Sequence, residues 1–264
     1  MHEFARTALE AAEAAVRIHR RDQGRVRVAA AAEKGRADYV SRTDRDAQEA
    51  ALAVIRARHP DHGVLAEEED GDPEERLAAW DGAPLWVVDP LDGTANFLHG
   101  HPMYAASVAL AVDGRPVAGA VVCGSSGERW WAARSEGAYK GGRRILVSAP
   151  CSLRDAMVGT GFPFKVPELV AGYTDAFRRV LGAAAGVRRA GAAALDLCFL
   201  AQGSFDAFWE SFLNPWDFAA GWVIAEEAGG VLTRVDGTPL TLARGTVMGA
   251  NGVELLDELG RVVR

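Results

Sequence analysis

Apolar residues recur every three or four positions in two early segments, which is the spacing of an amphipathic helix. The first segment covers residues 3–21 and stops at Gly24. The second begins at Thr43, a suitable N-cap residue, and ends at His59-Pro60. The apolar face of the first segment consists of Phe4, Ala8, Leu9, Ala12, Ala15, Val16 and His19. The pattern therefore predicts two helices near the start of the chain.

Short strands are favoured between and after these helices. Residues 25–32 alternate loosely and predict a strand, whereas residues 33–43 are polar and predict a loop. Residues 63–66 and 85–88 are short apolar runs that predict buried strands, and a polar linker over residues 72–84 separates them. Residues 103–112, 117–123, 127–133 and 137–140 predict an antiparallel meander, with a hairpin turn at Asp113-Gly114.

The pattern changes near residue 148, after which strands and helices alternate. Strands are predicted at residues 157–161, 187–189, 205–210, 231–235 and 247–250. Helices are predicted at residues 167–182, 192–202, 215–228 and 253–262. Such alternation is typical of helices packed on a sheet. We therefore expect fold class α/β, with an α+β N-terminal half over residues 1–147 and an α/β C-terminal half over residues 148–264.

The apolar run over residues 85–88 is followed directly by a polar segment that begins at Asp89. Pro90 lacks an N–H group and is expected to end the strand, and Asp92 follows closely enough for both carboxylates to share one space. Gly93 permits close backbone approach, Thr94 supplies a hydroxyl, and amides from Gly93 onward can face an anion. This combination indicates a hard cation bridged to a phosphate. The bland alternative is a polar turn in which the aspartates cap backbone amides.

Other acidic residues stand at the ends of predicted elements. Glu67 follows the strand over residues 63–66, and if that strand lies beside the next one, Glu67 and Asp89 emerge at the same sheet edge. Asp217 lies in the first helical turn after Asn214-Pro215, where capping alone would explain it. Asp44 is a first-turn acid of the second helix, where it interacts favourably with the helix dipole.

Convergence of these carboxylates would have a large electrostatic consequence. Two carboxylates about 4 Å apart repel by roughly 4 kcal/mol at an effective dielectric near 20. Several of them together need protons or divalent cations. Oxygen ligands with no cysteine and no evident histidine favour Mg²⁺ or Mn²⁺ over zinc. The residues considered as ligands are Glu67, Asp89, Asp92 and Asp217.

Composition narrows the class of protein. The 264 residues are 49% hydrophobic, enough to fill the core of one large domain or two intimate halves. A formal net charge of −7 argues against nonspecific nucleic-acid binding. Cys123, Cys151 and Cys198 are widely spaced and indicate neither a zinc ribbon nor a disulfide framework. Charged residues near the N-terminus and the lack of a long apolar run predict a cytoplasmic protein without a membrane partner.

The run Asp-Pro-Leu-Asp-Gly-Thr-Ala-Asn-Phe at residues 89–97 resembles the signature of the inositol monophosphatase family, the magnesium-dependent, lithium-sensitive sugar phosphatases. Residues 65–68 and 215–221 also look like family segments, so the resemblance covers nearly the whole chain. It implies a layered αβαβα sandwich of the sugar phosphatase type, with the active site between the two halves. It also implies a homodimer.

The resemblance implies a metal centre of two or three Mg²⁺ ions, for which Mn²⁺ can substitute. Glu67, Asp89 and the Leu91 carbonyl would hold the first ion. Asp89, Asp92 and Asp217 would hold the second, with Asp89 bridging. A third, weaker ion would use Glu67 and water.

The resemblance also implies catalytic and substrate contacts. Thr94, hydrogen-bonded to Asp44, would orient and deprotonate the attacking water. Glu210 stands where related enzymes bind ring hydroxyls, whereas Ala192 replaces a Ser or Thr of many relatives. Lys34 stands where the family often has a basic residue near the site. The predicted phosphate and substrate contacts are Asp92, Gly93, Thr94, Ala193, Glu210 and Asp217.

The leading hypothesis is Mg²⁺-dependent hydrolysis of a small phosphorylated polyol, inositol monophosphate, by a metal-activated water. Histidinol-phosphate phosphatase is a close alternative, and fructose bisphosphatase or adenosine bisphosphate phosphatase activities are further ones. A different class is a regulatory protein that keeps the fold and contacts RNA or the transcription apparatus. The intact acidic positions and Thr94 favour an enzyme.

Overall fold

Helices and sheets alternate in layers in this computed structural model, which describes residues 1–28, 31–35 and 38–264. For residues 33–35 and 38 it describes the backbone alone, so the side chain of Lys34 lies outside the described residues. The helices are α1 (Glu3–Asp22), α2 (Arg42–Arg58), α3 (Pro73–Ala78), α4 (Thr94–His99), the 3₁₀ turn η2 (Leu153–Asp155), α5 (Pro167–Ala183), α6 (Ala193–Ala201), α7 (Pro215–Glu227) and α8 (Val253–Val263).

The larger sheet is ordered as the chain runs, and it is antiparallel except for its first pair of strands. In spatial order its strands are β3 (Gly63–Ala66), β4 (Leu85–Asp92), β5 (Ala105–Val112), β6 (Arg115–Cys123), β7 (Arg129–Ala133), β8 (Gly137–Lys140) and β9 (Arg143–Ile145). A separate hairpin consists of β1 (Ala32–Gly35) and β2 (Asp38–Val40).

The smaller sheet is mixed, because β10 pairs in parallel with both of its neighbours and β14 pairs antiparallel with both of its own. In spatial order its strands are β11 (Gly186–Arg188), β10 (Met157–Thr160), β12 (Ala207–Leu213), β14 (Gly245–Ala250) and β13 (Val231–Thr233). Because β10 runs parallel to both β11 and β12, the C-terminal ends of these three strands lie at the same edge of the sheet.

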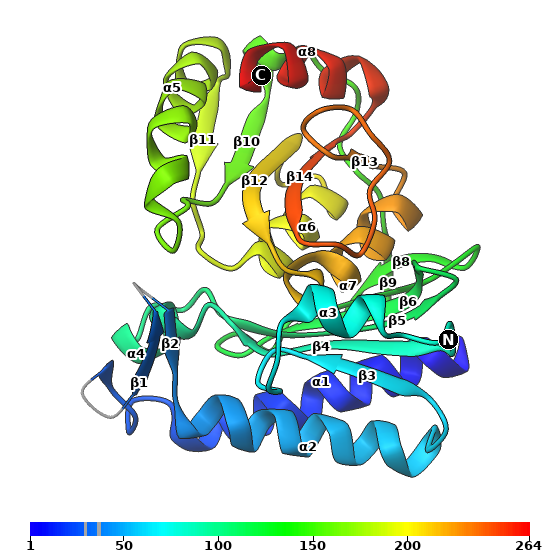
Figure 1. The fold of residues 1–264 in the computed structure, drawn as a ribbon. Coiled ribbons are helices and arrows are strands. Elements are labelled where there is room, and N and C mark those ends of the chain that lie inside the picture. The colour runs from blue at the N-terminus through cyan, green and yellow to red at the C-terminus, as the bar shows by residue number, and fades with distance from the viewer. Residues whose placement is uncertain (29–30, 36–37) are drawn as a thin grey trace.

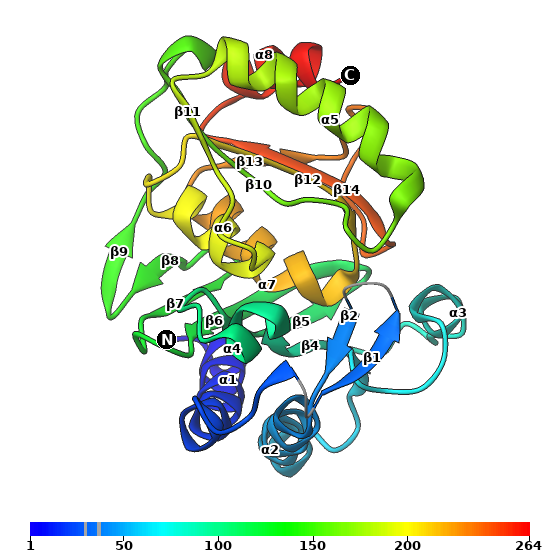
Figure 2. The same ribbon diagram turned by 90° about the vertical axis from the view of Figure 1, so that its left-hand side faces the viewer.

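Five layers result. Helices α1 and α2 cover one face of the larger sheet, α6 and α7 fill the space between the sheets, and α5 and α8 cover the outer face of the smaller sheet (Figure 1). The view in Figure 2 shows the same order from the side. The expected layered αβαβα sandwich is thus confirmed. Among the described residues, no helix combines the length and the apolar composition needed to span a membrane.

Helix α7 is buried on nearly every side, as expected for a helix packed between two sheets. Two glycines allow its close packing. A Cβ atom on Gly119 of β6 would lie 2.9 Å from the Cα of Ala220, and one on Gly221 would lie 2.5 Å from the Cβ of Leu197 in α6. The two halves therefore share one core. A domain boundary between residues 147 and 148 stays a prediction.

The predictions for residues 25–43 were partly wrong. No strand forms over the described residues 25–28; instead Val26 and Val28 pack against a small cluster that includes Leu91 of β4 and Phe97 of α4. The predicted loop contains the β1–β2 hairpin, although residues 29–30 and 36–37 lie outside the described residues. The N-cap of α2 is Ser41 rather than Thr43, because the Ser41 hydroxyl accepts a hydrogen bond from the Thr43 N–H group.

Two further predictions need correction. The linker over residues 72–84 contains α3, whose first amides donate to the side chain of Asp72. Pro90 does not end its strand: β4 continues to Asp92 and pairs with β5 on both sides of an irregularity between Asp89 and Asp92. Proline is tolerated at such a bulge because the ladder is already interrupted there.

We expect Gly221→Ala to lower the free energy of unfolding by about 1–3 kcal/mol, because the new methyl group forces α6 and α7 apart. Gly172→Ala is the matched control, since Gly172 lies in exposed helix α5 with nothing within 4 Å of a new Cβ atom. It should stabilise by roughly 0.5–1 kcal/mol. Urea denaturation measures both. Equal effects of the two substitutions would contradict the packing argument.

Candidate active site

The bulge in β4 is fixed by side chains and backbone around it. The Leu91 N–H group donates to Asp89 Oδ1 at 2.9 Å, so the Asp89 carboxylate caps its own turn. Buried His19 on α1 lies 2.7 Å from the Pro90 carbonyl through Nε2, which must carry the proton in that contact. Burial lowers the pKa of His19 to about 4, so the ring is neutral. The sequence placed His19 on the apolar helix face but gave no sign of this contact.

Gly93 turns the chain from β4 into α4. Its φ of +84° lies in the left-handed region, and a Cβ atom there would be 2.8 Å from the Met103 carbonyl oxygen. Only glycine fits this position without strain. Asp92 and Thr94, the residues before and after this turn, both border the cleft, as does Gly93 itself.

A cleft of about 440 Å³ opens between the two sheets. It is bordered by the ends of β3 and β4, by the start of α6, by β12 and by the start of α7. The predicted ligand and substrate residues that border it are Glu67, Asp89, Leu91, Asp92, Gly93, Thr94, Ala193, Glu210 and Asp217. Segments separated by more than a hundred residues in the sequence therefore meet in one place.

Asp44 does not border the cleft but reaches it through Thr94. The Thr94 hydroxyl lies 2.8 Å from Asp44 Oδ1 and 3.0 Å from the Leu91 carbonyl oxygen. The other carboxylate oxygen, Oδ2, accepts from the Ser41 N–H group at 2.8 Å and from the Ser41 hydroxyl at 2.6 Å. Burial raises the pKa of Asp44, and these donors oppose the rise. The capping role and the contact with Thr94 considered for this residue both occur.

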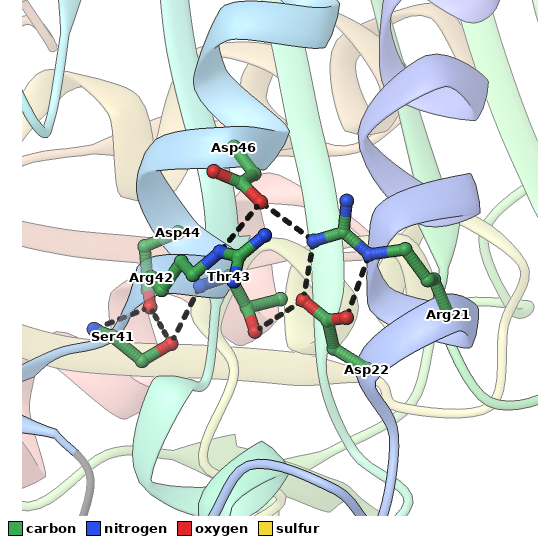
Figure 3. A network of polar contacts seen from close by, with 7 residues as sticks. All are labelled: Arg21, Asp22, Ser41, Arg42, Thr43, Asp44 and Asp46. Atoms are coloured by element: carbon green, nitrogen blue, oxygen red, sulfur yellow. Dashed lines mark hydrogen bonds and ion pairs between the residues drawn. The ribbon is translucent and has the colours of Figure 1, made fainter.

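A polar network holds the start of α2 against the end of α1 (Figure 3). Arg21 donates to Asp22 at 2.7 Å and to Asp46 at 2.6 Å, and the Thr43 hydroxyl donates to Asp22 at 3.0 Å. The network fixes the first turn of α2, and with it the direction in which Asp44 faces Thr94. The sequence did not indicate these contacts.

The buried carboxyl groups take up protons more readily than usual. Burial is the main cause of the raised pKa of Asp89, which lies well above its ordinary value, and the charges of Glu67, Asp92 and Asp217 add to it. Burial raises the pKa of Asp92 to about 7 despite the Ala194 N–H group, which donates to Asp92 Oδ2 at 2.9 Å. The cluster thus holds protons that a cation would displace.

Glu210 also lies in this acidic environment. Burial, followed by the charges of Asp217 and Asp92, raises the pKa of Glu210 to about 8. Its carboxyl group therefore keeps a proton at neutral pH, and it can donate as well as accept a hydrogen bond.

The donor set fits a hard divalent cation, because it consists of carboxylates and the Leu91 carbonyl. In the described part of the chain, however, no three Asp, Glu, His or Cys side chains already surround one metal position. One oxygen of each of three carboxylates accepts from a backbone amide: Asp89 from Leu91, Asp92 from Ala194, and Asp217 from Asn214 at 2.7 Å.

Several residues at the cleft or next to it were missed by the sequence predictions. Asn96 donates to the carbonyl oxygens of Met103 at 2.6 Å and Ala190 at 3.0 Å, which ties α4 to the segment before α6. Arg189, part of a basic pair in the sequence, borders the cleft beside Glu210. Exposed Phe164 and Phe212 also border it, and no motif in the sequence marks them.

Comparison with known proteins gave consistent matches. A sequence profile of the inositol monophosphatase family matches residues 1–264. The Nus factor SuhB of Pseudomonas aeruginosa is 41% identical over 247 residues, which cover 92% of this chain and 90% of that protein. The inositol-1-monophosphatase of Rhizobium meliloti is 42% identical over 231 residues, which cover 88% and 85%. The structure of extragenic suppressor protein suhB from Bartonella henselae superposes with a TM-score of 0.89 at 37% identity, covering 98% and 97%.

We expect the metal-free protein to lose stability as the pH rises through about 7 and 8, the raised pKa values of Asp92 and Glu210. Below these values the folded state holds protons that the unfolded chain binds only near pH 4, so the stabilising proton uptake is lost on raising the pH. Magnesium chloride should therefore raise the thermal midpoint more at about pH 8 than at about pH 6, where it must displace protons.

Thermal denaturation in the presence of a chelator and of magnesium measures this difference. The histidines whose pKa is lowered add stability as the pH rises toward 6.5, their ordinary value, but this opposite trend is the same with chelator and with magnesium and cancels in the comparison. The variant Asp92→Asn should reduce the pH dependence of the magnesium effect. A magnesium effect of the same size at both pH values in the wild type would contradict the electrostatic account.

Proposed function

The chain belongs to the inositol monophosphatase family, and from this premise we propose that its cleft hydrolyses small phosphate monoesters, with inositol monophosphate as the leading substrate. The products are inositol and phosphate. The observation that carries the proposal is the hydrogen bond between Thr94 and Asp44 beside the buried carboxylates of the cleft. A hydroxyl held by a buried carboxylate next to a polyanionic centre is suited to activating water.

Enzymes of this family depend on metal ions, and we infer that this one uses two or three Mg²⁺ ions, with Mn²⁺ as a substitute. When bound, the ions supply a water of lowered pKa and stabilise the leaving oxygen. The chain supplies the ligands proposed for them: Glu67, Asp89, the Leu91 carbonyl, Asp92 and Asp217. Sensitivity to lithium belongs to the same proposal.

The proposed roles of the other groups follow from their geometry. Thr94 directs its proton toward Asp44 and Leu91, so its oxygen lone pairs are available to accept a proton from a water in the cleft. Asp44 then accepts the threonine proton, and its burial makes it a stronger base than an exposed aspartate. The amides of Gly93 and Thr94 are proposed to hold phosphate oxygens.

Substrate choice is proposed to depend on the part of the cleft that β12 and the start of α6 border. Glu210 borders the cleft and is proposed to bond a ring hydroxyl of the substrate. Ala193 borders the cleft through the start of α6, where Ala192 offers no hydroxyl of its own. One polyol contact is therefore missing, which favours a substrate range wider than inositol monophosphate. Histidinol phosphate, fructose bisphosphate and adenosine bisphosphate remain the competing substrates.

A second candidate function comes from the relatives named Nus factor SuhB, which suggest contact with the transcription apparatus. The intact cleft favours this as an additional role rather than a replacement for catalysis. We further infer a homodimer and a cytoplasmic location; nonspecific nucleic-acid binding is disfavoured by the net charge of −7.

Phosphate release from a panel of substrates tests the proposed function. The panel contains inositol monophosphates, histidinol phosphate, fructose bisphosphate and adenosine bisphosphate, each with magnesium and with or without lithium. We expect fast, lithium-sensitive release from inositol monophosphate. Preference for histidinol phosphate would change the substrate but keep the mechanism. Release from none of them, with magnesium still bound, would favour the regulatory role.

We expect Thr94→Ala to lower kcat by about 100-fold or more, because the water loses its proton acceptor. Magnesium affinity should stay nearly unchanged, since the side chain is not a proposed ligand. The variant Thr94→Ser keeps the hydroxyl near Asp44 and should retain most of the activity. Steady-state kinetics and calorimetric titration with magnesium measure the two effects. Unchanged turnover in Thr94→Ala would remove this residue from the mechanism.

A further inference from the structure

Phe212 has a backbone conformation that bulky residues rarely adopt. Its φ of +64° lies in the left-handed region, within strand β12 and at the irregularity between Glu210 and Leu213. Among the described residues, the other non-glycine residues with positive φ are Asp113 and Ser135, which lie in the turns after β5 and β7. Turns explain those two, whereas nothing in strand geometry requires a phenylalanine at this position.

The conformation turns the Phe212 ring away from the core. The residue is 38% exposed and borders both the cleft and a second cavity beside it. The Arg244 guanidinium lies 5.1 Å from the ring centroid, and Arg244 Nε donates to Asn214 Oδ1 at 2.8 Å. The ring is thus held in place at the mouth of the cleft. Bulges next to active sites commonly redirect a side chain in this way, and residues in rare conformations cluster where function demands them.

Other groups of the same wall have similar chemistry. Phe164 is 50% exposed and borders the cleft. The Arg189 guanidinium lies 5.3 Å from the ring centroids of both Phe162 and Phe164. Carboxylates suited to cations and phosphate thus line the cleft together with these aromatic and cationic side chains. A substrate whose phosphate is held by ions at the carboxylates has its leaving group within the same cleft as the rings.

We propose that Phe212 is a specificity-determining residue that stacks on the leaving group and favours phosphate monoesters of nucleosides over those of acyclic polyols. Flat aromatic rings stack on phenylalanine faces and on arginine planes, whereas a short flexible polyol offers no such face. This inference rests on the proposed phosphatase function and specifies which part of the substrate range the cleft mouth selects. It requires no change in how the phosphate end is bound.

Two substitutions separate the ring from the backbone strain. Phe212→Leu removes the ring and keeps a branched side chain at positive φ, whereas Phe212→Gly removes both the ring and the strain. Ser135→Gly is the matched control, since it relieves a φ of +65° in a turn outside the cleft. The probes are adenosine 2′-monophosphate and glycerol 2-phosphate. Comparing each variant with the wild type on the same substrate cancels the intrinsic reactivity of the two esters.

Both Phe212 variants should lower kcat/KM for adenosine 2′-monophosphate by about tenfold, mainly through KM, and for glycerol 2-phosphate by less than about twofold. Ser135→Gly should change neither. Equal losses on both substrates, or no loss on either, would overturn the proposal. So would a changed oligomeric mass with an unchanged substrate ratio, which would identify Phe212 as a subunit contact.

Failure of the proposed function has a different signature. In that case the wild type releases phosphate from neither ester. The affinity for adenosine 2′-monophosphate, measured by calorimetry, then tests the stacking contact by itself, because binding needs no turnover. Affinity that falls about tenfold in Phe212→Leu supports the contact, and equal affinity of the wild type and the variant excludes it.

Discussion

The burial of several neighbouring carboxyl groups at the junction of the two sheets is the constraint on which the rest of the site depends. Removing such groups from water disfavours their charged form, and two ionised carboxylates about 4 Å apart would repel by roughly a further 4 kcal/mol at an effective dielectric near 20. The fold offsets part of this repulsion with backbone N–H groups from three different elements, which donate to Asp89, Asp92 and Asp217. Burial, with a smaller contribution from the neighbouring charges, still holds the pKa of Asp89 and Asp92 above the ordinary range. The remaining electrostatic cost is what makes the site receptive to cations.

The same contacts join the two halves of the chain. Asp92 at the end of the larger sheet accepts from the first turn of α6, and Asn96 donates to the carbonyl oxygens before that helix. Helices α6 and α7 in turn pack against the larger sheet in a shared core. Because the cleft lies at this joint, the packing of α7 on Gly119 sets the relative positions of ligands that come from different halves. Stability and site geometry are therefore coupled.

Local signals predicted most helices and strands and the polar segment over residues 89–94, whereas the layered order and the cleft between the two halves were predicted from the resemblance to the family. The local signals failed where tertiary contacts override local preference. Pro90 was expected to end β4, but pairing with β5 resumes beyond the bulge, and buried His19 bonds the Pro90 carbonyl. The left-handed backbone of Phe212 was beyond prediction, because a Ser-Phe-Leu run carries none of the glycine or asparagine that normally marks such a position.

Two of the proposed functional acids show why local and functional interpretations need not compete. Asp44 and Asp217 are both the third residue of a helix, and each forms a capping box with the N-cap residue of its helix, Ser41 or Asn214. A carboxylate has two oxygens, so Asp44 caps α2 with one and accepts from Thr94 with the other. The helix start thus orients the carboxylate without additional residues. It follows that a capping pattern in the sequence cannot distinguish a structural acid from a functional one. The distinction depends on what the second carboxylate oxygen contacts, which for Asp44 is Thr94.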